Sequence, residues 1–381
     1  MTWLAESYVY GLDPFAVRFS GNFGIRWYGL AYALGFLLGW VVLRHFARTK
    51  RTPLVDKGVG DLMTWLIVGV LVGGRVGWAV YYQGGQPFLD FRSTFPYWGL
   101  LDIMGGGMSA HGGLTGVILA VILYGSRHTL PSLHILDMLT LAALPGLFLG
   151  RLANFVNGEL WGEPLAAEMQ SNRVDGPPGE PPWWSIKYPA EITDTVQGYT
   201  WVTSDGSPVD AVAAGKLAQL EPLRSVFPGN TSFLPQVIEA AEDGNEAVLA
   251  TLEPMLTAFY PSQLIQALTD GPLLLAILLI VWLRPRKPGI VGCWFMMGYG
   301  GLRFLTEIFR QADADVDRLL GLSRGQVLSV LMFAVGAVLL IPLARRAGPK
   351  FDGPFGRTDQ GRAAVDHWHA AASAASEADA T

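Results

Sequence analysis

Seven apolar stretches, each close to the length of a membrane-spanning helix, constrain this chain more than any other feature of its sequence. A helix needs about 20 consecutive apolar residues to cross a bilayer, where no water can bind exposed backbone polar groups. The stretches lie at about 26–46, 60–82, 105–124, 134–156, 262–283, 289–309 and 325–344. Of the 381 residues 51% are hydrophobic and only 15% are charged, whereas about a quarter are charged in soluble domains. The sequence therefore predicts an all-α integral membrane protein of about seven transmembrane helices with a small extracytoplasmic domain.

The charge pattern and the cysteine content exclude several classes of protein. The net charge is −5 and no basic block is present, so we expect no nucleic-acid partner. Cys293 is the only cysteine, which excludes an internal disulfide or a multi-cysteine metal site. We expect neither a metal nor a cofactor. The first residues lack a basic leader before a short apolar core, so we expect no cleavable signal peptide.

Basic residues in four loops predict the orientation of the chain. The segments "RHFARTKRTPLVDKG", "GSRHTLPS", "RPRKPG" and "ARRAGPK" follow the first, third, fifth and seventh stretches. Seven spans place all four on one side of the membrane, and positive loops stay in the cytoplasm. We therefore expect the N-terminus outside the cell and the C-terminus in the cytoplasm.

The rest of the chain fits around this membrane core. We expect four parts: the first four transmembrane helices within 1–159, an extracytoplasmic insertion at 160–260, the last three helices within 261–346, and a cytoplasmic tail at 347–381. The insertion is rich in Pro, Gly and acidic residues, and its segments 207–226 and 234–255 are helical by spacing. The tail is rich in Ala and Ser without a core-forming pattern, which predicts no regular structure.

Several ionisable residues interrupt the apolar stretches, where each costs a few kcal/mol and is a functional candidate by default. They are Arg75, His111, Arg151, Glu159, Arg303 and Glu307. Purely structural explanations are also possible for some of these residues. Arg75 can reach the interface or tie helices together, and Arg303 and Glu307 have the i, i+4 spacing of a helix-internal ion pair. Asp137 is best interpreted as a cap or topology anchor. The glycines around His111 are typical of close helix packing.

The predicted orientation places polar groups from four stretches at one depth, in the outer half of the membrane. They are Tyr28, His111, Arg151, Asn154, Asn157, Glu159, Arg303, Glu307 and Arg310. A common depth favours one buried site over separate surface anchors. Arginines outnumber acids in this set, and guanidinium groups bind phosphate oxygens bidentately. A phosphate at this depth belongs to a phospholipid headgroup. Intramembrane charges would also serve an anion or lipid transporter, which is the rival hypothesis.

Six motifs resemble those of one family. "GRLANFVNGELWG" at 150–162 closely resembles the signature of the bacterial prolipoprotein diacylglyceryl transferases. In the family's order come "RWYGL" at 26–30, "GGRVGW" at 73–78, "HGGLTG" at 111–116, "PSQL" at 261–264 and "GYGGLRFLTEIFRQ" at 298–311. The resemblance implies transfer of diacylglycerol from phosphatidylglycerol to the lipobox cysteine of a preprolipoprotein. It also implies a thioether product, release of glycerol-1-phosphate and a place in the bacterial inner membrane.

The resemblance also implies site residues. Those expected to be catalytic are His111, Arg151 and Arg303, and those expected to bind substrate are Tyr28, Asn154, Glu159, Gly162, Tyr299 and Glu307. The hypothesis is that the arginines hold the phosphate, Asn154 and Glu159 orient the headgroup hydroxyls, and Glu159 or Glu307 keeps an arginine in place. His111 is the candidate base for the substrate thiol. The alternative is that nearby arginines lower the thiol pKa and no protein base is needed.

The motif "PSQL" has unusual neighbours. Tyr260 precedes it where the family has His, and Ile265 and Gln266 follow where the family has Tyr and Glu. An inactive, partner-binding relative therefore remains an alternative, as does another phospholipid-headgroup enzyme. Cys293 lies in an apolar stretch, and we expect it to serve core packing.

Overall fold

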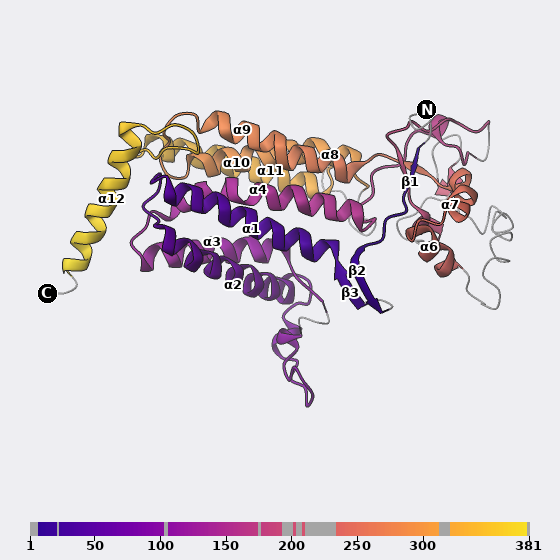
Figure 1. The fold of residues 1–381 in the computed structure, drawn as a ribbon, viewed down its shortest axis with the longest axis horizontal. Helices are drawn as coiled ribbons and strands as arrows, with labels where there is room; N and C mark the ends of the chain where they lie inside the picture. Colours follow the sequence, from indigo (N-terminus) through magenta and orange to yellow (C-terminus); the bar gives the residue numbers. More distant parts are fainter. Residues whose placement is uncertain are drawn as a thin grey trace. The chain divides into compact units, whose positions relative to one another are not determined.

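The computed structural model divides the chain into two compact units, which are described separately (Figure 1). It describes residues 7–20, 23–102, 106–173, 177–192, 201–202, 208–209, 234–311 and 321–378. The first unit comprises Met1–Gly35, Pro145–Leu274 and Tyr299–Phe333. The second comprises Phe36–Leu144, Leu275–Gly298 and Ala334–Thr381.

Five helices in the described ranges are long and apolar enough to cross a membrane. They are α1 Trp27–Arg48, α2 Asp56–Tyr81, α4 Ser132–Val156, the continuous helical segment Ser262–Val281, and α11 Arg324–Arg345. Two further helices occupy the third and sixth predicted stretches, α3 Ala110–Arg127 with 18 residues and α10 Ile290–Thr306 with 17. The chain is thus mostly helical and carries several membrane-spanning candidates.

Glycines bring the backbones of α2 and α3 into contact in the second unit. A Cβ atom on Gly112 would lie 2.2 Å from the Gly73 carbonyl oxygen, and one on Gly116 would lie closer still to the carbonyl of Gly69. Neither position can therefore carry a larger residue at this spacing. The prediction that the glycines around His111 allow close helix packing is confirmed for Gly112 and Gly116.

A small three-stranded sheet in the first unit joins distant parts of the chain. Strand β4 Ile186–Lys187 lies between β1 Tyr8–Val9, to which it is parallel, and β7 Ala258–Phe259, to which it is antiparallel. Residues 8 and 9, expected to belong with the membrane core, therefore pair with the inserted segment. An aromatic cluster packs beside the sheet and consists of Tyr10, Trp161, Ile186, Tyr188 and Phe259.

Two short helices form a second core in the inserted segment. Helices α6 Leu234–Glu242 and α7 Glu246–Leu252 confirm the helical prediction for 234–255. Their buried side chains are Val237, Ala241, Val248 and Leu252, with Met255 and Leu256 beyond. Of the predicted helix at 207–226, the structure describes only β6 Pro208–Val209, which pairs with β5 Trp201–Val202; the rest lies outside the described residues. Strands β2 Phe15–Ser20 and β3 Phe23–Arg26 pair just before α1.

A buried carboxylic acid lies at the centre of the inserted segment. Oε1 of Glu191 accepts a hydrogen bond from the Thr257 backbone N–H at 2.8 Å, and the side chain is almost fully buried. Burial raises the pKa of Glu191 well above its usual value, because a charged carboxylate would lose its hydration there. Its Oε2 atom has no hydrogen-bond partner among the described residues. The structure therefore favours the protonated acid.

The C-terminal segment differs from the expected tail without regular structure. It contains α12 Asp359–Ala378, which is rich in alanine, the residue with the highest helix propensity. Ahead of α12, the fully buried Phe351 stacks on the His134 ring with centroids 3.9 Å apart. Its carbonyl accepts hydrogen bonds from the Trp282 indole at 3.1 Å and the Arg286 backbone at 2.9 Å. The segment is therefore docked on the second unit.

Two other buried residues of the second unit, Asp137 and Cys293, contribute to helix capping and packing. Asp137 accepts hydrogen bonds at 2.7 Å from the backbone N–H groups of Gly289 and Gly292, at the N-terminus of α10. Its interpretation as a cap is confirmed, although the helix it caps is not its own. Cys293 is buried in α10, as core packing requires.

Candidate functional site

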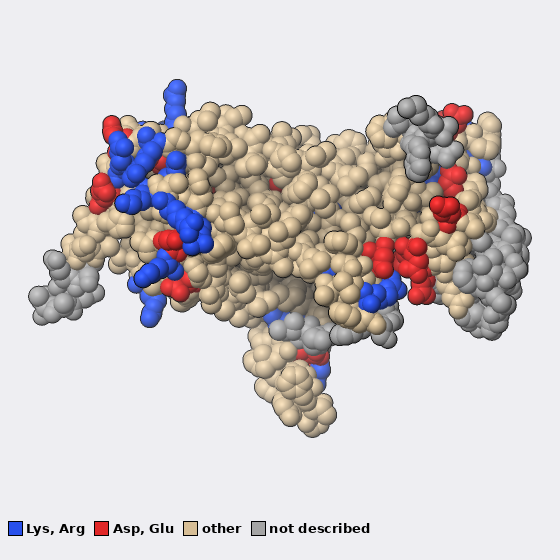
Figure 2. Space-filling view, viewed as in Figure 1, with Lys and Arg blue, Asp and Glu red and all other residues tan. Residues whose placement is uncertain are grey.

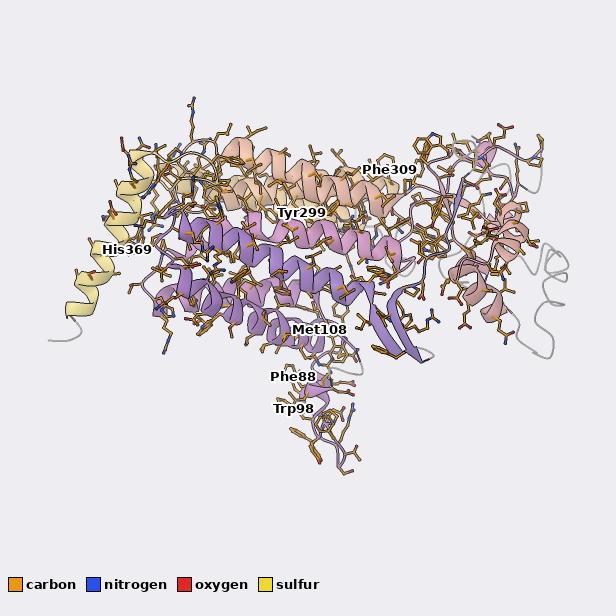
Figure 3. The ribbon with its side chains drawn as sticks, in the orientation of Figure 1. Phe88, Trp98, Met108, Tyr299, Phe309 and His369 are labelled. Carbon is orange, nitrogen blue, oxygen red and sulfur yellow. The ribbon has the colours of Figure 1, made fainter. Side chains whose placement is uncertain are left out.

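Arg151 forms an ion pair with an aspartate of a neighbouring helical segment. Its Nε atom lies 3.0 Å from Oδ2 of Asp270, and the two side chains are 18% and 0% exposed. Tyr299 of α10, labelled in Figure 3, interacts with the same guanidinium. The pair therefore fixes the last turns of α4 against the part of the 262–281 segment that belongs to the first unit.

Asp270 is a site residue that the sequence reasoning missed. It lies in η7 Thr269–Leu273, a π-helical turn between α8 Ser262–Leu268 and α9 Leu274–Val281. Pro272 has no backbone N–H to donate, and a π-helical turn is a frequent feature of functional sites. The signal was available, because Asp270 is a carboxylate inside an apolar stretch, the criterion that selected the other candidates.

Glu307 is the centre of a second charged cluster. Its Oε2 lies 2.5 Å from Nη2 of Arg303, and its Oε1 lies 3.7 Å from Nη1 of Arg310 and accepts from the Ser323 hydroxyl at 3.2 Å. A Cβ atom on Gly325 would lie 2.2 Å from this Oε1, so a larger residue there would displace the Glu307 carboxylate. The i, i+4 ion pair expected for Arg303 and Glu307 is present.

Arg303 keeps one donor without a partner. Its side chain is 11% exposed, and Nη1 is buried with no hydrogen-bond partner among the described residues. A buried guanidinium N–H without an acceptor is costly, which makes it a place where an anionic ligand would be stabilised.

The charge balance of the two clusters is closer than the sequence indicated. Two carboxylates, Asp270 and Glu307, form ion pairs with arginines of these clusters. The expected excess of arginines is therefore reduced by Asp270. The buried Nη1 of Arg303, which has no acceptor among the described residues, still favours an anion over a neutral ligand.

A polar contact joins two of the predicted motifs. The buried Asn154 donates from Nδ2 to the Tyr28 hydroxyl at 3.4 Å, and the Tyr32 hydroxyl lies 3.5 Å from that of Tyr28. Tyr28 is in the first turn of α1 and Asn154 is in the last turn of α4. Two residues predicted to bind substrate are thus in contact.

Gly162 has a steric reason to be glycine. A Cβ atom there would lie 2.1 Å from the Tyr260 carbonyl oxygen and 2.9 Å from that of Phe309. On either side, Glu163 donates its N–H to Phe309 at 3.0 Å, and Tyr260 donates its N–H to Glu163 at 3.0 Å. Gly162 therefore lets three distant segments of the first unit meet, whereas its predicted role was substrate binding.

The exposed side chain of Glu159 precedes this crossing, and the "PSQL" residues hold the backbone around it. The Gln263 amide donates to the Glu159 carbonyl at 2.7 Å, and the Ser262 hydroxyl donates to the Leu160 carbonyl at 2.9 Å. The exposed carboxylate contrasts with the buried clusters of Asp270 and Glu307. Glu307, and not Glu159, is therefore the acid that holds Arg303 in place.

The positions where "PSQL" has unusual neighbours are filled by packing residues. The Tyr260 ring stacks on Trp184 with centroids 5.6 Å apart and contacts Phe309 at 5.3 Å. Gln266 is buried, and its Nε2 atom has no hydrogen-bond partner among the described residues. Ile265 is partly buried. These departures leave the two charged clusters intact.

His111 belongs to the second unit and is exposed near the start of α3. Ser109 caps this helix by accepting from the Gly112 N–H at 3.2 Å, and the His111 carbonyl accepts from Thr115 at 2.9 Å. The other eight predicted site residues all lie in the first unit. The imidazole is therefore accessible to solvent, and it belongs to a different unit from the arginine clusters.

Arg75 is a structural residue. Its guanidinium donates to the backbone carbonyls of Gly99, Leu100 and Asp102 at 2.7–2.8 Å and to those of Gly106 and Gly107. It also lies over the Trp78 ring, 4.2 Å from the centroid. These carbonyls accept hydrogen bonds from all three guanidinium nitrogens. Arg75 therefore holds α2 to the segment that leads into α3, which confirms its interpretation as a structural link.

Among the described residues, no group of three or more His, Cys, Asp or Glu side chains is arranged to hold a metal ion. The side chains gathered around Arg151 and Arg303 carry guanidinium, carboxylate, amide and phenol groups. These groups can bind and orient an anion and stabilise charge that develops on it.

Comparison with known proteins identifies the family. The family model described as prolipoprotein diacylglyceryl transferase matches residues 14–342. The phosphatidylglycerol–prolipoprotein diacylglyceryl transferase of Bdellovibrio bacteriovorus is 38% identical over 358 residues, covering 91% of this chain and 96% of the relative. The proteins of the same name from Acidiphilium cryptum and Rhodospirillum centenum are 32% and 33% identical over 88% and 87% of this chain. The chain therefore belongs to the prolipoprotein diacylglyceryl transferase family.

Proposed function

We propose that this chain transfers the diacylglyceryl group of phosphatidylglycerol to the lipobox cysteine of preprolipoproteins. The observation that carries the proposal is the buried Arg303, whose Nη1 lacks a hydrogen-bond partner among the described residues. The shared name and the nearly full-length match of the relatives support the same activity. A transporter is less favoured, because the relatives are all named as transferases.

The reaction is a displacement at carbon. The substrate thiolate attacks the diacylglycerol carbon bound to the phosphate oxygen, so that a C–S bond forms as the C–O bond breaks. The electron pair of the broken bond stays on the phosphate, which leaves as glycerol-1-phosphate. Arg151 and Arg303 bind the phosphate and stabilise its growing charge. Charge stabilisation of the leaving group is therefore the main task of the protein.

The carboxylates have positioning roles in this scheme. Asp270 orients Arg151 through its Nε atom, which leaves the terminal nitrogens for the phosphate. Glu307 contacts Nη2 of Arg303, which leaves Nη1 for the phosphate. Asn154 and Tyr28, which contact each other, orient the headgroup glycerol together with the exposed Glu159. Gly162 acts by allowing the chain segments around this region to meet.

The proton of the thiol has two candidate destinations. His111 is exposed and can accept it, because a neutral imidazole has one ring nitrogen that is a proton acceptor. The alternative is that the arginines lower the thiol pKa, so that the proton leaves to water. Activity of a His111→Gln variant against pH separates the two. A base role predicts loss near neutral pH that recovers as the pH rises and the thiol ionises without help, whereas thiol activation by arginine predicts the same pH dependence for the variant and the wild type.

The membrane arrangement is also part of the proposal. We infer seven spans in the bacterial inner membrane, with the N-terminus outside and the C-terminus in the cytoplasm. Figure 2 shows Lys and Arg gathered at the end of the second unit that carries α12, in agreement with the basic loops of the sequence. In a Cys293→Ala background, a thiol at Glu246 should react with an impermeant reagent outside intact cells, and one at Ser373 should not. The reverse labelling would refute the orientation.

A direct assay tests the activity. Purified protein in vesicles containing phosphatidylglycerol is incubated with a synthetic lipobox peptide, and the mass of the peptide is measured by mass spectrometry. A mass gain of one diacylglyceryl group, absent for a peptide with Ser in place of Cys, is the expected result. Vesicles of phosphatidylethanolamine alone serve as the lipid control. An unmodified peptide with folded protein and the correct lipid would refute the proposal and favour an inactive relative.

A further inference from the structure

Residues 82–102, called the arm below, extend from the second unit beside α2 and α3. In Figure 1 the arm runs sideways from these helices, across the direction of their axes. It contains η1 Gln86–Phe88 and η2 Gly99–Leu101. Helix α2 is a membrane-spanning candidate that ends at Tyr81. A segment that leaves its end across the helix axis runs along the bilayer surface and not away from it.

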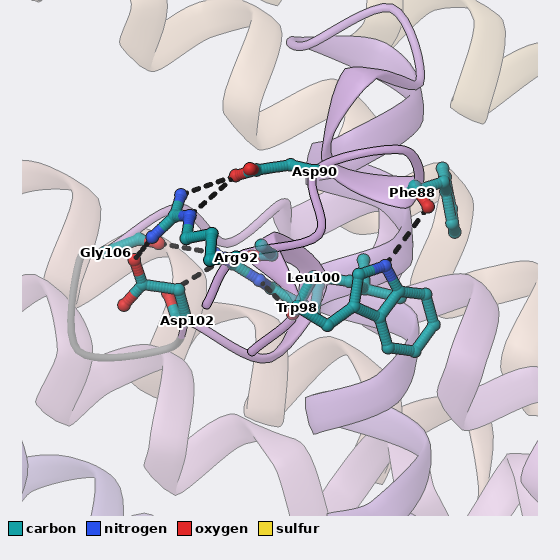
Figure 4. Close-up of polar contacts among 9 residues, drawn as sticks. Phe88, Asp90, Arg92, Trp98, Leu100, Asp102 and Gly106 are labelled. Carbon is teal, nitrogen blue, oxygen red and sulfur yellow. Dashed lines mark hydrogen bonds and ion pairs between the residues drawn. The ribbon is translucent and has the colours of Figure 1, made fainter. Parts of the chain in front are cut away.

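The arm has a fixed internal structure (Figure 4). Arg92 lies between two carboxylates, with Nε 2.9 Å from Oδ2 of Asp90 and Nη1 2.9 Å from Oδ2 of Asp102. The Trp98 indole donates to the Phe88 carbonyl at 3.1 Å. The charged side chains Asp90, Arg92 and Asp102 thus pair with one another within the arm.

Arg75 fixes the arm to α2. Three of the backbone carbonyls to which it donates, those of Gly99, Leu100 and Asp102, belong to the arm. Because Arg75 is buried in α2, the root of the arm is held by a short rigid connection. The direction of the arm relative to α2 is therefore set by the fold.

Large apolar side chains project from the arm. Leu89 is 81% exposed, Phe91 74%, Phe95 83% and Tyr97 61%. Four such side chains within nine residues form a patch that is unfavourable in water and marks an interaction surface. Aromatic rings are enriched where a membrane meets water, because they have apolar faces and tolerate the polar headgroups. The composition of the patch fits a lipid surface.

We propose that residues 89–97 insert into the headgroup and acyl boundary of the bilayer beside the end of α2. We choose lipid as the partner because the exposed surface of the membrane-spanning candidate α2 continues directly into the arm. Tyr81 and Tyr82, at the end of this helix, are 66% and 59% exposed and lead directly into the arm. The arm thereby anchors the α2–α3 pair at a fixed depth in the bilayer. The ion pairs of Arg92 with Asp90 and Asp102 partly neutralise these two carboxylates, which lowers the cost of placing them at the interface.

Nitroxide accessibility tests the insertion. A label is placed at Phe95→Cys in full-length Cys293→Ala protein reconstituted in phosphatidylglycerol and phosphatidylcholine vesicles. Collisions with oxygen, which concentrates in lipid, should exceed collisions with a water-soluble nickel chelate several-fold. A label at Glu246→Cys, on the exposed start of α7, should show the opposite order. The same order at both positions would overturn the proposal.

Other partners give distinct outcomes. Protection of the Phe95 label from both reagents that grows with the ratio of protein to lipid would indicate a second copy and overturn the proposal. Protection only when lipobox peptide is added would indicate peptide binding and would also overturn it. Neither outcome bears on the transferase activity.

A pair of variants tests the contribution of the ring itself. With the label at Leu89→Cys, Phe95→Asp should raise nickel collisions several-fold, because a carboxylate draws the arm out of the interface. Phe95→Tyr should leave them unchanged, since a phenol suits the interface. Equal nickel collisions in the two variants, at unchanged thermal stability, would show that residue 95 does not meet lipid.

Discussion

Replacing Asp270 with Asn tests whether this carboxylate orients Arg151 for catalysis. Asn keeps the size of the side chain but removes its charge and offers one acceptor oxygen in place of two, so Arg151 Nε loses the carboxylate that lies at 3.0 Å. A displacement of a catalytic group by about 1 Å costs roughly 10²-fold in rate, or about 2.7 kcal/mol of transition-state stabilisation. We therefore expect kcat per folded molecule to fall by about 10²-fold.

The kinetic parameters should not fall equally. The Arg151 charge remains, and it still attracts the phosphate of bound lipid, so the KM for phosphatidylglycerol should change little. The orientation of the guanidinium matters most as charge grows on the leaving group, so the loss should appear in kcat. Initial rates in the vesicle assay, divided by the amount of folded protein, give both parameters.

Asp137→Asn is the matched control. Asp137 is also a buried aspartate, but it accepts from the backbone of α10 and not from an arginine. Both variants should lower Tm, because each disturbs a buried carboxylate with its partners. Only Asp270→Asn should lower kcat. A normal kcat per folded molecule for Asp270→Asn, with a reduced Tm, would refute the positioning role and leave a purely structural one.

Three further changes test other parts of the structure. Arg303→Lys should lower kcat by roughly 10²–10³-fold while the protein still inserts, because lysine lacks the planar fork of donors; near-normal turnover would make Arg303 a structural residue. Gly162→Ala should prevent isolation of monodisperse protein, because its Cβ would lie 2.1 Å from a carbonyl oxygen, whereas Gly150→Ala, which meets nothing within 4 Å, should purify normally. Burial raises the Glu191 pKa, so the folded state keeps a proton that the unfolded state releases above its usual pKa of 4.5, and stability falls as the pH rises beyond that value. Glu191→Gln should remove this fall, and Tm values measured from pH 4 to pH 8 that decline equally in both proteins would contradict the assignment.

The membrane helices and most of the charged site could be predicted from local sequence. Apolar length determines where a helix can cross a bilayer, and each of the seven stretches contains a helix in the structure. A charge inside such a stretch is costly enough to signal function without any knowledge of its partner. Arg151 and Arg303 were selected in this way. Asp270 satisfied the same criterion, but its Thr, Gly and Pro neighbours resemble the end of a helix.

Partners distant in sequence could not be predicted. Strand β1 is only two residues long, and its partner β4 follows more than 170 residues later, so no local pattern reveals the pairing. The role of Arg75 depends on carbonyls of an irregular loop, which any sequence would supply. Gly162 matched a motif, but only the approach of Tyr260 and Phe309 explains why it must be glycine.

The docking of Phe351 on His134 and Trp282 has a consequence for biogenesis. Residues 351–378 follow the last membrane helix, so they leave the ribosome only after every span has been made. Until then the Trp282 indole N–H and the Arg286 backbone lack the partners that Phe351 supplies. Completion of this part of the second unit thus follows synthesis of α11. A chain truncated before Phe351 would retain its predicted catalytic residues and still present an unfinished surface to membrane proteases.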